Sequence, residues 1–190
     1  MTLFWRHGYD RVSIADLTDA LNMAPPSLYA AFGSKERLFD EVLDHYTATR
    51  LDYIRKAIEE GPSARDAVAK ILRECAKRYA VSEAPSGCLI GSAVIAPGSS
   101  NVGRILAERR NRSRLVLTHL FKAAQAKGEI AESVDAMALA HYYSAVAQGM
   151  SSQAVDGATP AQLAAVAEAA IAAWPSLAGA TSRSESIRAS

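Results

Sequence analysis

The sequence predicts an all-α protein, and three observations support this. Apolar residues recur with helical spacing along most of the chain, helix-forming residues dominate between the breaks, and no segment alternates polar and apolar residues as a strand would. The 11 glycines and 7 prolines stand mainly at apparent helix boundaries. Because 49% of the 190 residues are hydrophobic, the chain can bury a substantial core.

Composition excludes several classes of protein. The formal net charge of +1 gives no general preference for nucleic acid. Two cysteines, Cys75 and Cys88, are too few for a secreted disulfide framework or a structural zinc site. No run of about 18 apolar residues suggests a membrane span, and no signal peptide is evident. We expect a cytoplasmic protein that does not contact a membrane.

The sequence also lacks the patterns of an enzyme. It has no nucleophile elbow, no phosphate-binding loop and no clustered acid-base pair. The four histidines do not share the i, i+4 spacing of a metal site: His7, His45, His119 and His141. We expect neither catalytic residues nor a metal or other cofactor.

Three short helices are expected in the first 33 residues. Residues 2–7 form the end of a helix that Gly8 terminates in a left-handed conformation. Ser13 caps the second helix, with Asp16 at capping-box spacing and an apolar face of Ile14, Leu17 and Leu21. Asn22 occupies a turn that requires positive φ. The third helix begins at Pro25-Pro26, carries Leu28 and Phe32 on one face, and ends at Gly33.

Longer helices are expected in the remainder. Ser34 caps a helix that continues to about residue 60, and Ser63 caps one over 64–81. The broken stretch 83–100 contains a brief helix at 88–96. Long helices follow at 101–127, 135–155 and 160–174, the last with Thr159 as N-cap. Residues 176–190 form a disordered tail.

The second and third helices, joined by a short turn, form a helix-turn-helix. The following residues carry a closer resemblance: Phe4, Gly8-Tyr9, Ser13-Ile14, Leu17, Ala20-Leu21-Asn22-Met23, Ser27-Leu28-Tyr29, Phe32-Gly33-Ser34-Lys35-Glu36 and Leu38-Phe39. This pattern resembles the DNA-binding domain of the tetracycline-repressor (TetR) family. The resemblance implies a helix-turn-helix domain over residues 1–45 and a helical ligand-binding and dimerisation domain over 46–175. It also implies a homodimeric, effector-released repressor of palindromic double-stranded DNA.

Six residues are expected to contact DNA. Ser13 presents a helix N-terminus to a phosphate, Pro25 and Pro26 touch a thymine methyl group, and Ser27 bonds a base edge or phosphate. Tyr29 and Lys35 match family positions that bind the DNA backbone. The alternatives are that Pro25-Pro26 only begins the helix, that Tyr29 packs against a neighbouring helix, and that Lys35 is a solvated charge.

Two features depart from the family pattern. Phe4 falls near the end of the first helix, so that helix is expected to be truncated by about ten residues. Residues 1–58 contain seven Lys and Arg against eight Asp and Glu, so a basic footprint is missing. The alternative function is therefore a helical small-molecule-binding protein whose head no longer binds DNA well.

The C-terminal helices carry stripes of small residues that allow close helix packing. The expected dimer interface comprises Tyr142, Ala145, Gly149, Ser152, Ala167, Ala170, Ile171 and Trp174. The resemblance also places a dimer interface on the last two long helices. The alternative is that these residues form an ordinary intramolecular core.

The resemblance places the pocket for an unknown small-molecule effector among the middle helices. The candidate lining residues are Leu72, Cys75, Tyr79, Cys88, Val116, Leu120 and Tyr143. Five arginines between Arg104 and Arg114 are mostly solvated, although one turned inward would pair with an anionic effector. The two cysteines act either as a redox switch or as small buried apolar residues.

Overall fold

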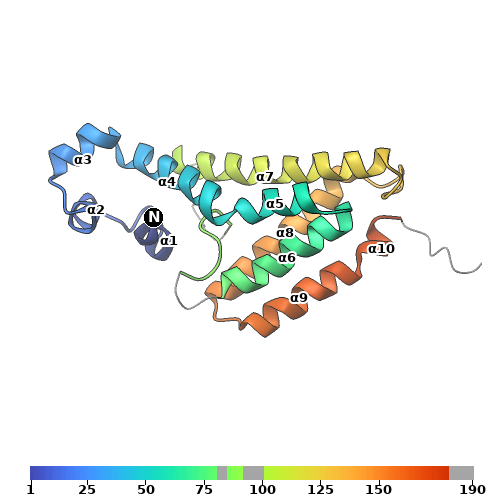
Figure 1. The fold of residues 1–190 in the computed structure, drawn as a ribbon. Coiled ribbons are helices and arrows are strands. Elements are labelled where there is room, and N and C mark those ends of the chain that lie inside the picture. The colour runs from blue at the N-terminus through green and yellow to red at the C-terminus, as the bar shows by residue number, and fades with distance from the viewer. Residues whose placement is uncertain (81–84, 92–100, 180–190) are drawn as a thin grey trace, which may run out of the picture.

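The computed structural model describes residues 1–80, 85–91 and 101–179, and this part of the chain contains helices but no strands. Three short helices form a head at one end, and α4 leads from the head into a body of longer helices (Figure 1). The helices are α1 (Thr2–His7), α2 (Ile14–Leu21), α3 (Pro25–Phe32), α4 (Lys35–Arg50), α5 (Asp52–Glu60), α6 (Ala64–Tyr79), α7 (Asn101–Ala126), α8 (Ala136–Val155), α9 (Pro160–Ala172) and α10 (Trp174–Leu177). The predicted all-α architecture, a helix-turn-helix head followed by a helical bundle, is confirmed.

Most local signals for helix ends are confirmed, but Gly8 ends α1 with φ 76° and ψ 164°, so its ψ is extended and the predicted left-handed conformation is wrong. Ser13 and Asp16 form a complete capping box, in which the Asp16 backbone N–H donates to the Ser13 hydroxyl at 3.1 Å. Thr159 and Gln162 form a second capping box at the start of α9. Asn22 has φ +50° and ends α2 in the left-handed conformation. These ends could be predicted because each depends on residues within four positions.

The prediction of one helix from Ser34 to about residue 60 is wrong. The helix breaks at Leu51, where φ is −106° and ψ is 6°, and α5 begins at Asp52. No glycine or proline marks this position. The break gives α5 its own direction, and Tyr53 and Ala57 of α5 are buried in the body. Because the predicted domain boundary at residues 45–46 falls inside α4, head and body share this helix.

Two other segments differ from expectation. Residues 88–91 form a turn rather than the start of a helix, and residues 92–96 of the predicted helix lie outside the described part. The predicted disordered tail over residues 176–190 is wrong at its start, because α10 extends to Leu177 and Ala178 is fully buried; residues 180–190 of that tail lie outside the described part. The Ala131 N–H donates to the Ala178 carbonyl at 3.0 Å, which fixes this end of the chain.

Aromatic side chains pack the head onto α4. The Phe4 and Phe39 rings lie edge to face with centroids 5.0 Å apart, and Trp5 and Tyr46 do so at 5.1 Å. Leu28 of α3 is completely buried. The expected apolar face of α2 is only partly correct, because Leu21 is 45% exposed.

The body is built around α6. Helices α5, α8 and α9 pack mainly on α6, and α7 lies on the side of the body opposite α9, where it packs mainly on α8 (Figure 1). At the far end from the head, the rings of Phe121, Tyr143 and Trp174 form a cluster with centroids 5.8–6.1 Å apart. This packing leaves the space between α5, α6, α7 and α8 as the place where a cavity can form.

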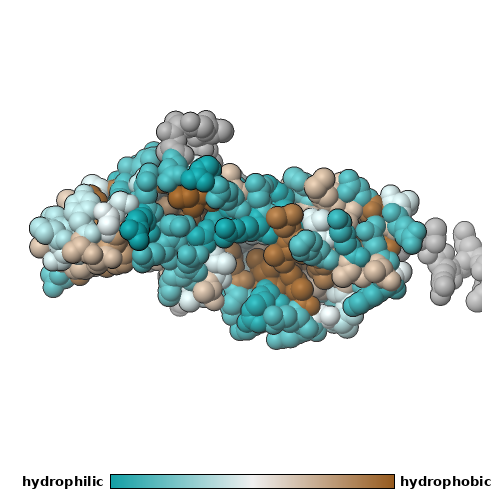
Figure 2. Space-filling model, turned by 90° about the horizontal axis from the view of Figure 1, so that it is seen from above, coloured by the Kyte–Doolittle hydropathy of each residue, from teal (hydrophilic) through white to brown (hydrophobic). Residues whose placement is uncertain are grey.

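Hydrophilic residues cover most of the face seen from above in Figure 2, and apolar residues gather in a hollow over the middle of the body. Within residues 1–80, 85–91 and 101–179, no helix combines the length and the hydropathy needed to span a membrane.

Candidate functional site

The exposed face of the α3 helix carries no charged side chain. Pro25, Pro26, Ser27 and Tyr29 are all exposed, and the Tyr29 side chain has 47% of its surface accessible. Leu28, between Ser27 and Tyr29, points into the head core instead. Because α3 contains no charged residue, its exposed face offers methyl and hydroxyl groups rather than charged groups for contact.

The N-terminus of α2 is already occupied by a carboxylate. The Ser13 hydroxyl and the Ser13 backbone N–H each donate to Asp16 Oδ2 at 2.7 Å. These hydrogen bonds from Ser13 lower the pKa of the Asp16 carboxyl. A phosphate approaching Ser13 therefore meets the negative charge of Asp16, and the amides beyond it become the more favourable donors.

Lys35 lies at the start of α4 beside the aromatic core of the head. Its Nζ is 4.2 Å from the centroid of the Tyr9 ring. Tyr9 in turn lies 5.2 Å from Phe39 and 6.0 Å from Phe4, measured between ring centroids. The Lys35 ammonium is thus held by a cation–π contact with the Tyr9 ring, and this contact orients the Lys35 side chain at the start of α4.

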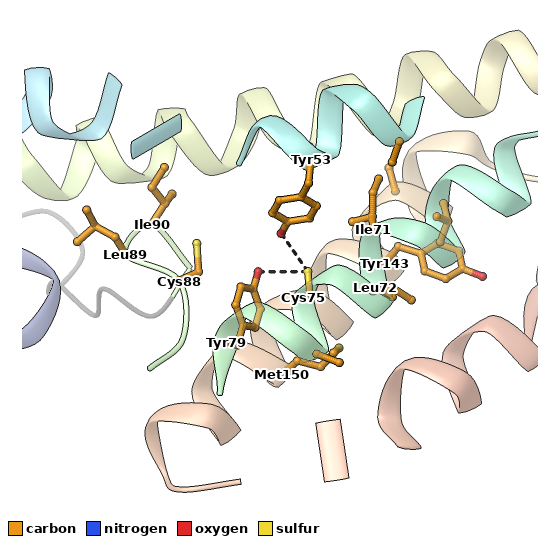
Figure 3. Packing of buried hydrophobic residues seen from close by; sticks show 14 of the residues in the cluster. Tyr53, Ile71, Leu72, Cys75, Tyr79, Cys88, Leu89, Ile90, Tyr143 and Met150 are labelled. Atoms are coloured by element: carbon orange, nitrogen blue, oxygen red, sulfur yellow. Dashed lines mark hydrogen bonds between the residues drawn. The ribbon is translucent and has the colours of Figure 1, made fainter. Parts of the chain in front are cut away.

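A cavity of about 100 Å³ lies among α5, α6, α7 and α8. Five of the predicted pocket residues line it: Leu72, Cys75, Tyr79, Cys88 and Tyr143 (Figure 3). Two predicted residues are absent from its lining. Val116 is 46% exposed and lies in a separate groove among α4, α5 and α7, and Leu120 packs partly buried against the core. Both residues are on α7, and a small rotation of this helix about its axis decides which of its side chains face the cavity.

The cavity has further lining residues that the sequence analysis did not select. They are Leu51, Tyr53, Ile54, Val68, Ile71, Ile90, Gly91, Arg110, Ser113, Leu117, Ser144, Ala147 and Gln148. Among them, Tyr53 and Ile54 lie on α5, whose direction follows from the break at Leu51. The sequence allows one of the five arginines between Arg104 and Arg114 to turn inward but does not indicate which one. In the structure it is Arg110.

Two tyrosine hydroxyls surround the Cys75 thiol. Cys75 Sγ lies 3.2 Å from Tyr53 Oη and 3.4 Å from Tyr79 Oη (Figure 3). Burial raises the pKa of the Cys75 thiol to about 11. The thiol is therefore protonated at neutral pH and is a poor nucleophile. Cys75 and Cys88 are both buried, as expected for small apolar residues.

Arg109 and Arg110 point in different directions from α7. Arg109 Nη2 lies 2.5 Å from Asp40 Oδ1, and Arg109 also pairs with Asp44, so it joins α7 to α4. These hydrogen bonds raise the pKa of the Arg109 guanidinium. Arg110 faces the cavity and donates to the Ile90 carbonyl at 3.0 Å.

The two predicted stripes of the dimer interface lie in different environments. Tyr142, Ala145, Gly149 and Ser152 are exposed along one line of α8. Ala167, Ala170, Ile171 and Trp174 are buried within the protomer, so they belong to its own core and do not face a partner. Ala167 and Ala170 of α9 thus serve close packing within the protomer, where α9 packs mainly on α6.

Among the described residues, no three His, Cys, Asp or Glu side chains are grouped so that they could hold a metal ion. The candidate functional features of this part of the chain are the exposed α3 face, the cavity with Arg110, and the exposed stripe of α8.

Comparison with known proteins agrees with this arrangement. The sequence profile of the bacterial regulatory proteins of the tetR family matches residues 1–42. The chain is 32% identical over 180 residues to the transcriptional repressor ComR of Escherichia coli K12, covering 93% of this chain and 86% of ComR. It is 39% identical over 88 residues to the repressor BdcR of the same organism, covering 46% of this chain and 45% of BdcR.

A solved structure matches the whole architecture. It is a cysteine-substituted form of the TetR family regulator CifR in complex with 26-base-pair operator DNA, with 40% identity and a TM-score of 0.86. The match covers 92% of each chain, so both the head and the body are included. The chain belongs to the TetR family of bacterial transcriptional regulators.

Proposed function

We propose that this protein is a dimeric transcriptional repressor that binds a palindromic operator through α2 and α3 and releases it when a small molecule occupies the body cavity. The observation that carries the proposal is the likeness, over 92% of both chains, to CifR in complex with operator DNA. The relatedness to the repressor ComR over 93% of this chain supports the same sign of regulation.

The DNA contacts of the proposal come from the exposed head. Pro25, Pro26 and Ser27 begin α3 and would enter the major groove, with apolar contacts to thymine methyl groups and a hydroxyl for a base edge. Tyr29 and Lys35 would bind the backbone on either side. The Ser13 end of α2 would approach a phosphate through backbone amides, since its hydroxyl already donates to Asp16.

Dimerisation would use the exposed stripe of α8. Four of its residues, Tyr142, Ala145, Gly149 and Ser152, have spacings of three, four and three positions, which place them on one face of the helix. Small residues there allow the two α8 helices to approach closely across a two-fold axis. A two-fold dimer presents two copies of α3, which suits the two half-sites of a palindrome.

Contacts that run from the cavity through α7 to α4 provide a route by which a bound molecule would release the operator. Leu51, Arg110 and Ser113 line the cavity, so a bound molecule touches both the break after α4 and the inner face of α7. The neighbouring Arg109 is paired with Asp40 and Asp44 of α4. A shift of α7 or of the break would therefore tilt α4, which carries the head, and effector and operator binding would be coupled.

Selection from random duplexes followed by a salt titration tests the proposal. We expect enrichment of a palindromic site and a steep fall of affinity with salt, since phosphate contacts release counterions. Lys35→Ala should weaken binding and reduce the salt slope, whereas Lys122→Ala, an exposed lysine on the distal part of α7, should change neither. Failure to enrich any site would contradict the proposal.

Two observations favour a second candidate function. Residues 1–58 have no excess of basic residues, and α3 has no charged residue. In that case the chain is a small-molecule-binding protein without a DNA function. Ligand binding in the cavity together with no salt-dependent DNA affinity would support it, and an enriched palindrome would exclude it.

A further inference from the structure

Arg110 has a position that its neighbouring arginines do not share. Arg104 pairs with Glu108 one turn away on the surface of α7, and Arg109 pairs with two carboxylates of α4. Arg110 instead lies among the residues that line the body cavity. The Arg110 side chain is partly exposed, and its guanidinium lies beside a lining that is mainly apolar.

No carboxylate in the described ranges lies within ion-pair distance of Arg110. Its Nη1 donates to the Ile90 carbonyl at 3.0 Å, which uses one of the five N–H donors of the guanidinium. Burial and the nearby Arg114 lower the pKa of the Arg110 guanidinium. A bound anion would pair with a guanidinium that has no carboxylate partner among the described residues.

The rest of the lining limits what that anion is attached to. Ile54, Ile71, Leu72 and Leu117 supply apolar walls, and the Tyr53 hydroxyl is already engaged by Cys75. One cation therefore stands opposite a mainly apolar surface. The lining also carries the polar side chains of Ser113, Ser144 and Gln148. This arrangement suits a molecule with a charged end and a hydrocarbon body.

The size of the cavity limits the molecule further. An engineered protein cavity of about 150 Å³ accommodates benzene. At about 100 Å³, this cavity has room for a smaller body of a few carbon atoms.

We propose that the cavity binds a short-chain carboxylate as its effector, with the Arg110 guanidinium holding the carboxylate and the apolar walls holding the hydrocarbon. This inference rests on the proposed function and names the chemical class of the effector. A planar guanidinium matches a carboxylate with two parallel hydrogen bonds, so the acid should bind in preference to a neutral molecule of the same shape.

Isothermal titration of the full chain with propanoate, butanoate and pentanoate, each compared with its amide, tests the inference. We expect at least one acid to bind about tenfold or more tightly than its amide, the effect of a charge-assisted hydrogen bond. Arg110→Gln should abolish the preference, and Arg110→Lys should retain part of it. Arg112→Gln, on the same helix but exposed and outside the lining, should leave it unchanged.

The comparison of acid with amide in the unaltered protein does not depend on the folding of any variant. If no acid binds better than its amide, or if folded Arg110→Gln keeps the preference, the inference is overturned. Measuring operator release by the same compounds distinguishes failure of the carboxylate inference from failure of the proposed repressor function. Release by amide and acid alike would overturn the carboxylate inference and leave the effector-responsive repressor intact, whereas absence of any operator would refute the repressor itself.

Discussion

Gly149→Leu probes the proposed dimer interface with little effect on the protomer. Gly149 lies on the exposed stripe of α8, and a Cβ added there meets no heavy atom within 4 Å. A leucine is therefore accommodated in the single chain. Replacing a glycine inside a helix with a good helix former should even stabilise the protomer, by roughly 0.5–1 kcal/mol.

The dimer should respond in the opposite direction. If small residues allow the two α8 helices to approach closely, the leucine is inserted twice because of the two-fold symmetry. Overpacking costs about 1–3 kcal/mol at each site, hence roughly 2–6 kcal/mol for the pair. This corresponds to a dimer dissociation constant weakened by roughly 30-fold to roughly 20,000-fold.

Sedimentation velocity across a concentration series, together with thermal unfolding, provides the measurement. Gly149→Ala should have a smaller effect on the dimer, and Thr49→Leu, at an exposed position of α4, should have none. An unchanged dissociation constant for Gly149→Leu would place the interface on another surface. A lowered melting temperature of the isolated protomer would refute the inference that leucine fits there.

Three other perturbations test the head, the buried thiol and the link between α7 and α4. Tyr29→Ala should weaken operator binding by about tenfold with an unchanged melting temperature, because the side chain is 47% exposed, and normal binding would remove Tyr29 from the interface. Folding raises the pKa of the Cys75 thiol from 9.0 to about 11, so the folded protein holds this proton more tightly than the unfolded chain does. The free energy of unfolding should therefore fall by about 2–3 kcal/mol as the pH rises from 9 to 11. In urea unfolding, Cys75→Ala should reduce that loss, and an identical pH profile would contradict the assignment. A double-mutant cycle of Arg109→Met and Asp44→Asn should give a coupling energy of about 0.5–1 kcal/mol, and additive effects would show that the ion pair contributes nothing.

The sequence by itself determined the helical fold and most helix starts. Ser13 with Asp16 and Thr159 with Gln162 form the predicted capping boxes, and Asn22 adopts the predicted positive φ. Each of these signals acts over three or four residues, so no distant contact is needed to produce it. The head could be recognised for the same reason, since its residues lie within one continuous segment.

Tertiary packing decided how the helices are used. The break at Leu51 has no local marker, yet it directs α5 and so places Tyr53 at the cavity. Small residues on α8 and α9 look alike in sequence, but only packing against α6 shows that Ala167 and Ala170 are internal.

The same distinction explains the arginines of α7. Arg109 and Arg110 are adjacent and chemically identical, and their roles differ because consecutive helical positions point about 100° apart. Asp40 and Asp44 of α4 lie on the side that Arg109 faces, whereas Arg110 faces α5, α6 and α8 across the cavity. The sequence specifies the side chains and the helix, but the partner of each side chain follows from how separate helices pack together.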